Sequence, residues 1–213
     1  PKSDTCTMLG CSSLLSTFAS LKKRCNISGF FECDGNDFLE CYETTKKAAG
    51  YEDYFLGSII VSKRNGKSYL VDGQQRVTSL TLLLIYLYRA AKSNPPPAAP
   101  NLAASLAPLI FSDNFGSPRF NLDIVERLPV IDALFHGQPF TPDGKDESIQ
   151  TMYARYHDIE ERDLAGELGV ALPHFAYWLM AKVGLIEIAS DSDEHASAIF
   201  ETMNDRGKPL SPV

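Results

Sequence analysis

The stretch SYLVDGQQRVTSLTLLLIYLYRAA, from Ser68 to Ala91, decides the fold of this chain. Its first residues, up to Val71, include the aromatic and branched side chains typical of a β-strand. From Val77 onward the stretch is apolar on nearly every helical face, and such a helix is usually buried on all sides. The stretch therefore predicts a strand that leads, through five polar or glycine residues, into a central buried helix.

A second strand is expected just before this one. Residues 54–61 form another aromatic and β-branched run, and Arg64-Asn65-Gly66-Lys67 separates the two runs. An Asn-Gly pair between such runs is the strongest short-range signal for a β-hairpin, because both turn residues must take positive φ. An antiparallel hairpin should therefore precede the central helix.

The central helix should end near Asn94, because the prolines at positions 95–97 and 100 cannot continue it. Before the hairpin, a helical pattern covers residues 37–49. The expected organisation is an amino-terminal segment with little assigned structure (1–53), a core (54–94), a Pro/Ala connector (95–104) and a second, mainly helical part (105–213).

The second part begins with a predicted hairpin around Asn114-Phe115-Gly116, between residues 109–111 and 119–122. Helices and one short strand over 183–188 follow. The expected apolar helix stripes are Ile149, Met152, Tyr153, Tyr156 and Ile159, then Leu172, Phe175, Ala176 and Leu179, then Ala196, Ile199, Phe200 and Met203. Asp191 and Glu194 are expected to cap the last helix. This order of elements predicts an α+β fold.

The composition excludes several classes of protein. Among 213 residues 44% are hydrophobic, and 20 Lys and Arg against 27 Asp and Glu give a net charge of −7. Such a chain can bury a core, but it lacks the overall positive charge that neutralises a nucleic-acid backbone. Its longest apolar run, from Leu82 to Tyr88, is too short for a membrane span, and no signal peptide is visible. A cytoplasmic location is expected.

All five cysteines lie in the first 41 positions, and their odd number and spacing favour reduced thiols over disulfides or a zinc site. The chain opens on Pro1 and stops at Val213 directly after a polar motif. We expect it to be a piece of a longer protein.

The residues Asp72-Gly73-Gln74-Gln75-Arg76 form the first candidate site. The first turn of a helix presents unpaired N–H groups and a positive dipole end, which bind anions. Here Gly73 would allow close approach, Arg76 could pair with a phosphate and Asp72 could hold a metal or orient a water. The structural alternative is that Asp72 caps the helix and Arg76 pairs with an acidic residue.

The second candidate site is Asn204-Asp205-Arg206-Gly207-Lys208, at the end of the last predicted helix. Cations at a helix C-terminus often only compensate its dipole. If both sites serve one polyphosphate, Arg76 and Arg206 should share a cleft. The chain has no GxxxxGK[ST], GxSxG or HExxH motif, which excludes a P-loop and leaves no marked nucleophile.

Three blocks of this sequence resemble the amino-terminal domain of GmrSD-type, modification-dependent restriction proteins. They are the residues 55–59, then 71–80 around Asp-Gly-Gln-Gln-Arg, and 200–211 around Asn-Asp-Arg-Gly. The Asp-Gly-Gln-Gln-Arg block is specific, and the order and spacing of the blocks fit. One departure is that residues 1–53 contain no Tyr-Gln-Arg, which such proteins typically carry near their start.

The resemblance implies a ParB/sulfiredoxin-like core, a small mixed sheet with a buried helix, and additional helices in the second half. It also implies a nucleoside triphosphate site that uses Mg²⁺ and often hydrolyses the nucleotide, in bacterial defence against phage. DNA cutting would belong to a His-Asn-His nuclease domain or subunit outside this chain. The residues expected to act are Asp72, Gln74, Gln75 and Arg76 in catalysis, Asp72 toward the metal, and Gly73, Arg76, Asn204, Arg206, Gly207 and Lys208 toward the nucleotide.

A rival hypothesis comes from a different class of function. The domain could be a non-catalytic module that senses modified DNA, or binds a partner, and so controls a nuclease elsewhere. A local basic patch for DNA could form from Lys63, Arg64 and Lys67 on the first hairpin. Release of phosphate from a nucleotide distinguishes the two hypotheses.

Overall fold

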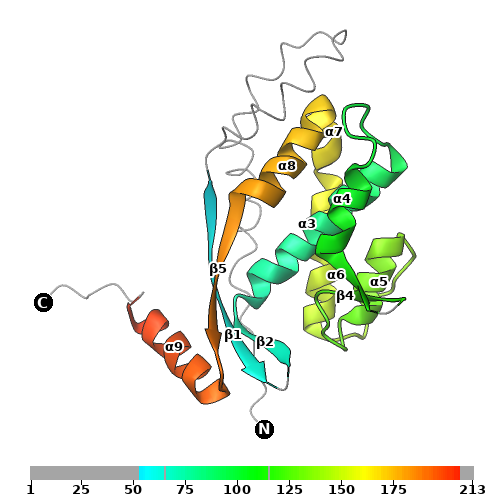
Figure 1. Cartoon of the computed structure of the whole chain (residues 1–213). Coiled ribbons are helices and arrows are strands. Elements are labelled where there is room, and N and C mark those ends of the chain that lie inside the picture. The colour runs from blue at the N-terminus through cyan, green and yellow to red at the C-terminus, as the bar shows by residue number, and fades with distance from the viewer. Residues whose placement is uncertain (1–52, 65, 115, 207–213) are drawn as a thin grey trace, which may run out of the picture.

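The computed structural model describes residues 53–64, 66–114 and 116–206 (Figure 1). The predicted helix over 37–49 lies outside these residues. The elements are β1 (Tyr54–Arg64), β2 (Lys67–Asp72), α3 (Gln74–Ser93), α4 (Leu102–Ile110), β3 (Phe111–Asn114), β4 (Ser117–Phe120), α5 (Leu128–His136), α6 (Glu147–Glu161), α7 (Leu164–Leu168), α8 (Leu172–Lys182), β5 (Val183–Ser190) and α9 (Asp193–Arg206).

The larger sheet has the strand order β2-β1-β5. Strands β1 and β2 form the predicted antiparallel hairpin, in which Arg64 pairs with Lys67. Strand β5 pairs with β1 in parallel, from Tyr54 opposite Val183 to Ser62 opposite Ser190. The sheet is therefore small and mixed, and with the helices it confirms the predicted α+β class. The finer ParB/sulfiredoxin-like assignment stays a prediction.

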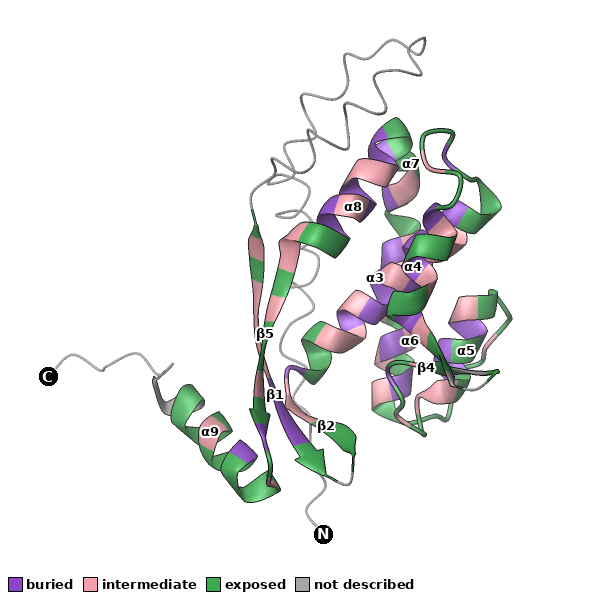
Figure 2. Cartoon of the chain, in the orientation of Figure 1, coloured by how far each residue is buried: buried purple, intermediate pink, exposed green. Residues whose placement is uncertain are grey.

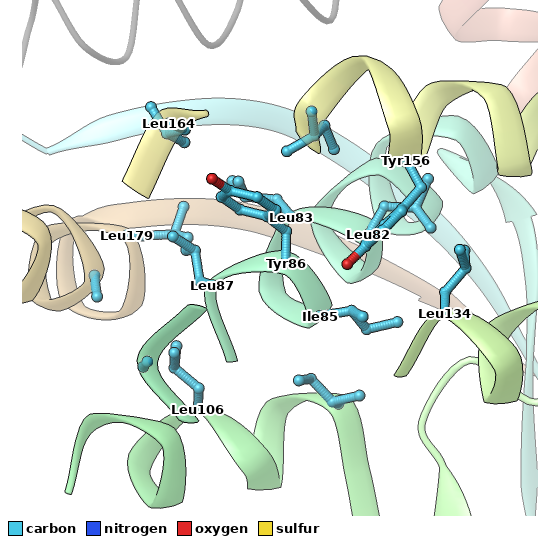
Figure 3. Packing of buried hydrophobic residues seen from close by; sticks show 14 of the residues in the cluster. Leu82, Leu83, Ile85, Tyr86, Leu87, Leu106, Leu134, Tyr156, Leu164 and Leu179 are labelled. Carbon is cyan, nitrogen blue, oxygen red and sulfur yellow. The ribbon is translucent and has the colours of Figure 1, made fainter. Parts of the chain in front are cut away.

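Helix α3 is the central element of the hydrophobic core, as its apolar sequence predicts. Leu83, Ile85 and Leu87 are completely buried. Figure 3 shows these side chains packed among residues of other helices, including Leu106 of α4 and Tyr156 of α6. A long buried helix packs on several neighbours at once, so α3 joins the core (54–94) to the helices of the second part (105–213).

Two details of the second half differ from the sequence-based expectation. Leu109 and Ile110 end helix α4 and do not begin the second hairpin, whose first strand starts at Phe111. The reason is that Leu102, Leu106 and Ile110 recur every four residues and are all buried, so the helix continues until its stripe is covered. The hairpin itself is confirmed, since β3 and β4 pair from Phe111 opposite Phe120.

The start of α9 also differs. The expected cap was Asp191 with Glu194, but Oγ of Ser192 accepts a hydrogen bond from the backbone N–H of His195 at 3.2 Å. The backbone carbonyl of Ser192 accepts the first helical bond, from Ala196. Ser192 is therefore the N-cap residue, because β5 continues to Ser190 and the chain turns one residue later than expected.

Helices α3 and α9 lie on opposite faces of the sheet. On one face, a Cβ atom at Gly57 of β1 would meet the side chain of Arg76 in α3, and a Cβ atom at Gly73 would meet the side chain of Ile59 in β1. These contacts place the start of α3 against that face. Ser62 of β1 instead donates a hydrogen bond to Asp193, the first residue of α9, at 2.6 Å. Residues 57 and 59 point to the other face from residue 62, since side chains alternate along a strand. Figure 1 shows the same separation of the two helices.

Within the described ranges, none of the helices combines the length and apolar character that a membrane span requires.

Candidate functional site

The first candidate site lies where β2 turns into α3. Strand β2 ends at Asp72, and Gly73 is the N-cap of the helix, in the left-handed region with φ 87° and ψ 12°. A Cβ atom at this position would lie 2.5 Å from Cγ2 of Ile59, which is closer than packing allows. The turn therefore requires glycine both for its backbone conformation and for its contact with β1.

The first turn of α3 begins at Gly73, which has no side chain to cap it. Within the part of the chain that the structure describes, no side-chain cap hydrogen bond is made there, and the turn contains no acidic residue. The prediction that Asp72 caps the helix is therefore wrong: Asp72 belongs to β2, where it pairs with Ile60. The positive end of a 20-residue helix therefore lies at this turn, where it favours an anion.

Arg76 lies against the sheet at this turn. Its Nη1 donates a hydrogen bond of 2.5 Å to the backbone carbonyl of Ser58, and lies 3.7 Å from Oδ2 of Asp72. The predicted pairing of Arg76 with an acidic residue is thus confirmed. Gly57, at φ 125°, makes room for the guanidinium, since a Cβ there would lie 3.1 Å from Nε. The side chains of Arg76 and Asp72 remain 42% and 31% exposed, so a ligand can reach both.

The two glutamines complete the turn. Both side chains are exposed, and Nε2 of Gln74 donates to the backbone carbonyl of Leu70 at 3.3 Å. The backbone carbonyl of Gln75 accepts from Oγ of Ser79 at 2.6 Å, which ties the turn to the second turn of the helix. The structure therefore brings Asp72, Gly73, Gln74, Gln75 and Arg76 together at one exposed helix start.

The second candidate site is not brought to the first by the described residues. Asn204 and Arg206 lie in the last turn of α9, on the opposite face of the sheet from α3, and their side chains are outside what the structure describes. Gly207 and Lys208 also lie outside the described residues. The shared cleft of Arg76 and Arg206 stays a prediction.

Arg127, which the sequence reasoning missed, is a further cation beside α3. It precedes helix α5, and its Nη1 lies 3.5 Å from Oγ1 of Thr78, one turn beyond the start of α3. Its side chain is only partly exposed. No local motif marks Arg127, because its contact with Thr78, 49 positions earlier in the sequence, depends on the tertiary structure.

The described acidic residues do not form a metal site by themselves. Among the described residues, no group of three or more His, Cys, Asp or Glu side chains is placed to bind an ion. Asp72 is a single carboxylate that already faces Arg76. Mg²⁺ often binds through one or two carboxylates together with substrate phosphates, so Asp72 fits that ion only as a partner of a bound nucleotide.

The basic tip of the first hairpin is largely neutralised. Lys63 pairs with Glu187 at 2.9 Å, and Arg64 pairs with Asp193 at 2.6 Å. The guanidinium of Arg64 also lies 4.2 Å from the ring centre of Tyr69. These contacts weaken the hairpin as a patch for DNA phosphates, because the acidic partners already balance its charges.

A comparison with known protein families finds a match over most of the chain. The model of the family described as GmrSD restriction endonuclease, N-terminal domain, matches residues 18–213. The match includes both candidate sites and every element of the fold. No curated protein sequence matches the chain.

Proposed function

The chain belongs to the family of GmrSD restriction endonuclease N-terminal domains, and from this premise we propose that it binds and hydrolyses a nucleoside triphosphate to regulate DNA restriction. Membership gives the chain a role related to restriction. We propose in addition that the chain binds a nucleotide, that it hydrolyses this nucleotide, and that the residues named below carry out these steps.

The observation that carries the proposal is the uncapped start of α3. An exposed first turn without acidic residues, entered through Gly73 and flanked by Arg76, presents backbone donors and a cation on one surface. Phosphate groups bind at such helix starts because both the N–H groups and the helix dipole favour negative charge.

The roles of the residues follow from their positions. Arg76 would contact the phosphates with the N–H groups that Ser58 does not use, and Gln74 and Gln75 would orient the nucleotide or the attacking water. Asp72 would hold Mg²⁺, which neutralises phosphate charge when it is bound. The proposal also includes Asn204, Arg206, Gly207 and Lys208, which would complete the nucleotide site if the end of α9 reaches it.

The wider setting is part of the proposal. The domain would act in the bacterial cytoplasm in defence against phage, and a His-Asn-His nuclease domain or subunit would cut the DNA. The family description, which names a restriction endonuclease, supports this setting. The order of the sheet and the buried α3 are compatible with a ParB/sulfiredoxin-like core.

The test is phosphate release from each of the four nucleoside triphosphates with Mg²⁺, with and without modified DNA. We expect release from at least one of them, abolished in Asp72→Asn and unchanged in Asp132→Asn, a surface carboxylate of α5. Nucleotide binding without any release would contradict hydrolysis. DNA binding without nucleotide binding would favour the rival sensing module.

A further inference from the structure

The guanidinium of Arg76 lies against two glycines. A Cβ atom at Gly57 in β1 would lie 3.1 Å from its Nε and 3.4 Å from its Cζ, which is closer than a Cβ atom normally packs. A Cβ atom at Gly73 would lie 3.4 Å from its Nη1. The position of the guanidinium therefore depends on the absence of a side chain at Gly57.

The backbone of β1 is irregular at the same point. The pairing of β1 with β5 shifts by one residue between Phe55 and Gly57, which leaves Leu56 as the extra residue of a β-bulge. Gly57 has φ 125°, a value that glycine adopts far more readily than other residues. Bulges redirect side chains and are common beside functional sites. The bulge and the missing side chain thus coincide with the position of the Arg76 guanidinium.

The next residue of β1 supplies the acceptor for this guanidinium. Nη1 of Arg76 donates to the backbone carbonyl of Ser58 at 2.5 Å. Strand β2 pairs with β1 from Ile60 onward, so Ser58 lies beyond the paired part of the hairpin. Figure 2 shows the first turn of α3, which contains Arg76, as exposed, whereas the helix beyond it is largely buried or half-buried. The guanidinium is therefore held on β1 and is still within reach of a ligand.

We propose that Gly57 is a positioning residue for phosphate binding by Arg76. The bulge and the missing side chain let the guanidinium rest on β1, in a fixed orientation toward the ligand. Gly57 has no side chain to offer a nucleotide, so it acts through Arg76. A guanidinium that is already fixed loses less conformational freedom when it binds, which raises the affinity. This inference rests on the proposed function, since it assigns a role within the same nucleotide site.

The alternative role of Gly57 is purely structural. In that case the bulge requires glycine for its backbone alone, and a side chain at position 57 disturbs β1 whatever residue stands at position 76. In the proposed role, an added Cβ atom acts by moving the guanidinium, so its effect on nucleotide binding disappears once Arg76 is replaced by alanine. A double-mutant cycle between the two positions separates these roles.

The cycle is measured by calorimetric titration of the whole chain with each Mg²⁺–nucleoside triphosphate. We expect Gly57→Ala to weaken binding by about tenfold, as for a lost charge-assisted contact. In the Arg76→Ala background, Gly57→Ala should change the affinity by less than about twofold. The control Gly66→Ala, in the turn between β1 and β2, has φ 72° and no atom within 4 Å of the added Cβ, and should bind as wild type does.

Three results of this cycle would overturn the proposal. One is wild-type affinity in a folded Gly57→Ala protein. Another is an equal loss of affinity in both backgrounds, which assigns Gly57 a structural role alone. The third is unfolding of Gly57→Ala in both backgrounds, seen in the emission of Trp178, which is buried in the core on α8.

A second measurement tests the fixed guanidinium without a nucleotide and without a change at Gly57. In ¹⁵N NMR spectra, a guanidinium held through Nη1 gives separate Nη1 and Nη2 signals, because rotation about its Nε–Cζ bond is slow. We expect separate signals for Arg76, identified by their loss in Arg76→Ala, and averaged signals for Arg119, whose side chain is 62% exposed. Averaged signals for Arg76 would overturn the proposal. Separate signals in a wild-type chain that binds no nucleotide would support the positioning of Arg76 and contradict the proposed function.

Discussion

Nη1 of Arg76, in the first turn of α3, donates a 2.5 Å hydrogen bond to the backbone carbonyl of Ser58 in β1. This bond joins the central helix to the middle strand of the sheet at the point where the Asp-Gly-Gln-Gln-Arg motif begins the helix. A guanidinium has five N–H donors, so the bond to Ser58 orients Arg76 and leaves other donors for a phosphate. The motif therefore combines a structural contact with an exposed cation.

The glycine at the helix start should be the least replaceable residue of the motif. Gly73→Ala combines a positive φ with a Cβ 2.5 Å from Ile59, and should lower the free energy of unfolding by about 1–3 kcal/mol. The matched control is Gly144→Ala, which has φ 72° and no atom within 4 Å of the added Cβ. Urea denaturation measures both. Equal losses would mean that the contact with Ile59 contributes nothing.

Asp72 should matter for chemistry and little for stability. Because Gly73 and not Asp72 is the N-cap, Asp72→Ala and Asp72→Asn should both change the free energy of unfolding by less than about 1 kcal/mol, as for other exposed ion pairs. Both variants should abolish phosphate release. A loss of stability confined to Asp72→Ala would instead support a capping role.

The bond between Ser62 and Asp193 should hold α9 on the sheet. Ser62 is completely buried and its hydroxyl donates to Asp193 at 2.6 Å, so Ser62→Ala should cost about 1 kcal/mol. Ser68→Ala, at an exposed position of β2, serves as the control. If the two variants unfold at the same urea concentration, the bond does not anchor α9.

His174 should make stability depend on pH. Burial lowers the pKa of His174, in the first turn of α8, below its ordinary value. As the pH falls through about 6.5, the unfolded chain takes up this proton before the folded chain does, so stability decreases. His174→Gln should reduce the decrease in melting temperature between about pH 7.5 and pH 5.5. An unchanged decrease would assign the pH dependence to other groups.

Local signals in the sequence predicted much of the fold. The Asn-Gly turn gave the first hairpin, the apolar run gave α3, and the stripe from Ile149 to Ile159 gave α6. The predicted start of the second hairpin was wrong because tertiary packing determines where α4 ends. Ile110 is buried in the core, so α4 continues past Pro108 to this residue. Helix α5 was not assigned, although Pro129 at its start and Gly137 at its end are ordinary helix boundary signals.

The candidate site was predictable only in part. The motif located Asp72, Gly73 and Arg76 together, since they are adjacent in sequence. The acceptor of Arg76 was not predictable, because Ser58 contributes a backbone carbonyl that carries no sequence signal. Arg127 was missed for a similar reason, as its position beside Thr78 depends on how α5 packs against α3.

The most direct test of the central claim is calorimetric titration of the whole chain with each Mg²⁺–nucleoside triphosphate, for wild type, Arg76→Ala and the control Arg119→Ala, an exposed arginine of β4. Loss of one charge-assisted contact should weaken binding by about ten- to a hundredfold in Arg76→Ala, whereas Arg119→Ala should bind as wild type does. Wild-type affinity in Arg76→Ala, with the protein still folded, would contradict the proposed nucleotide site at the start of α3.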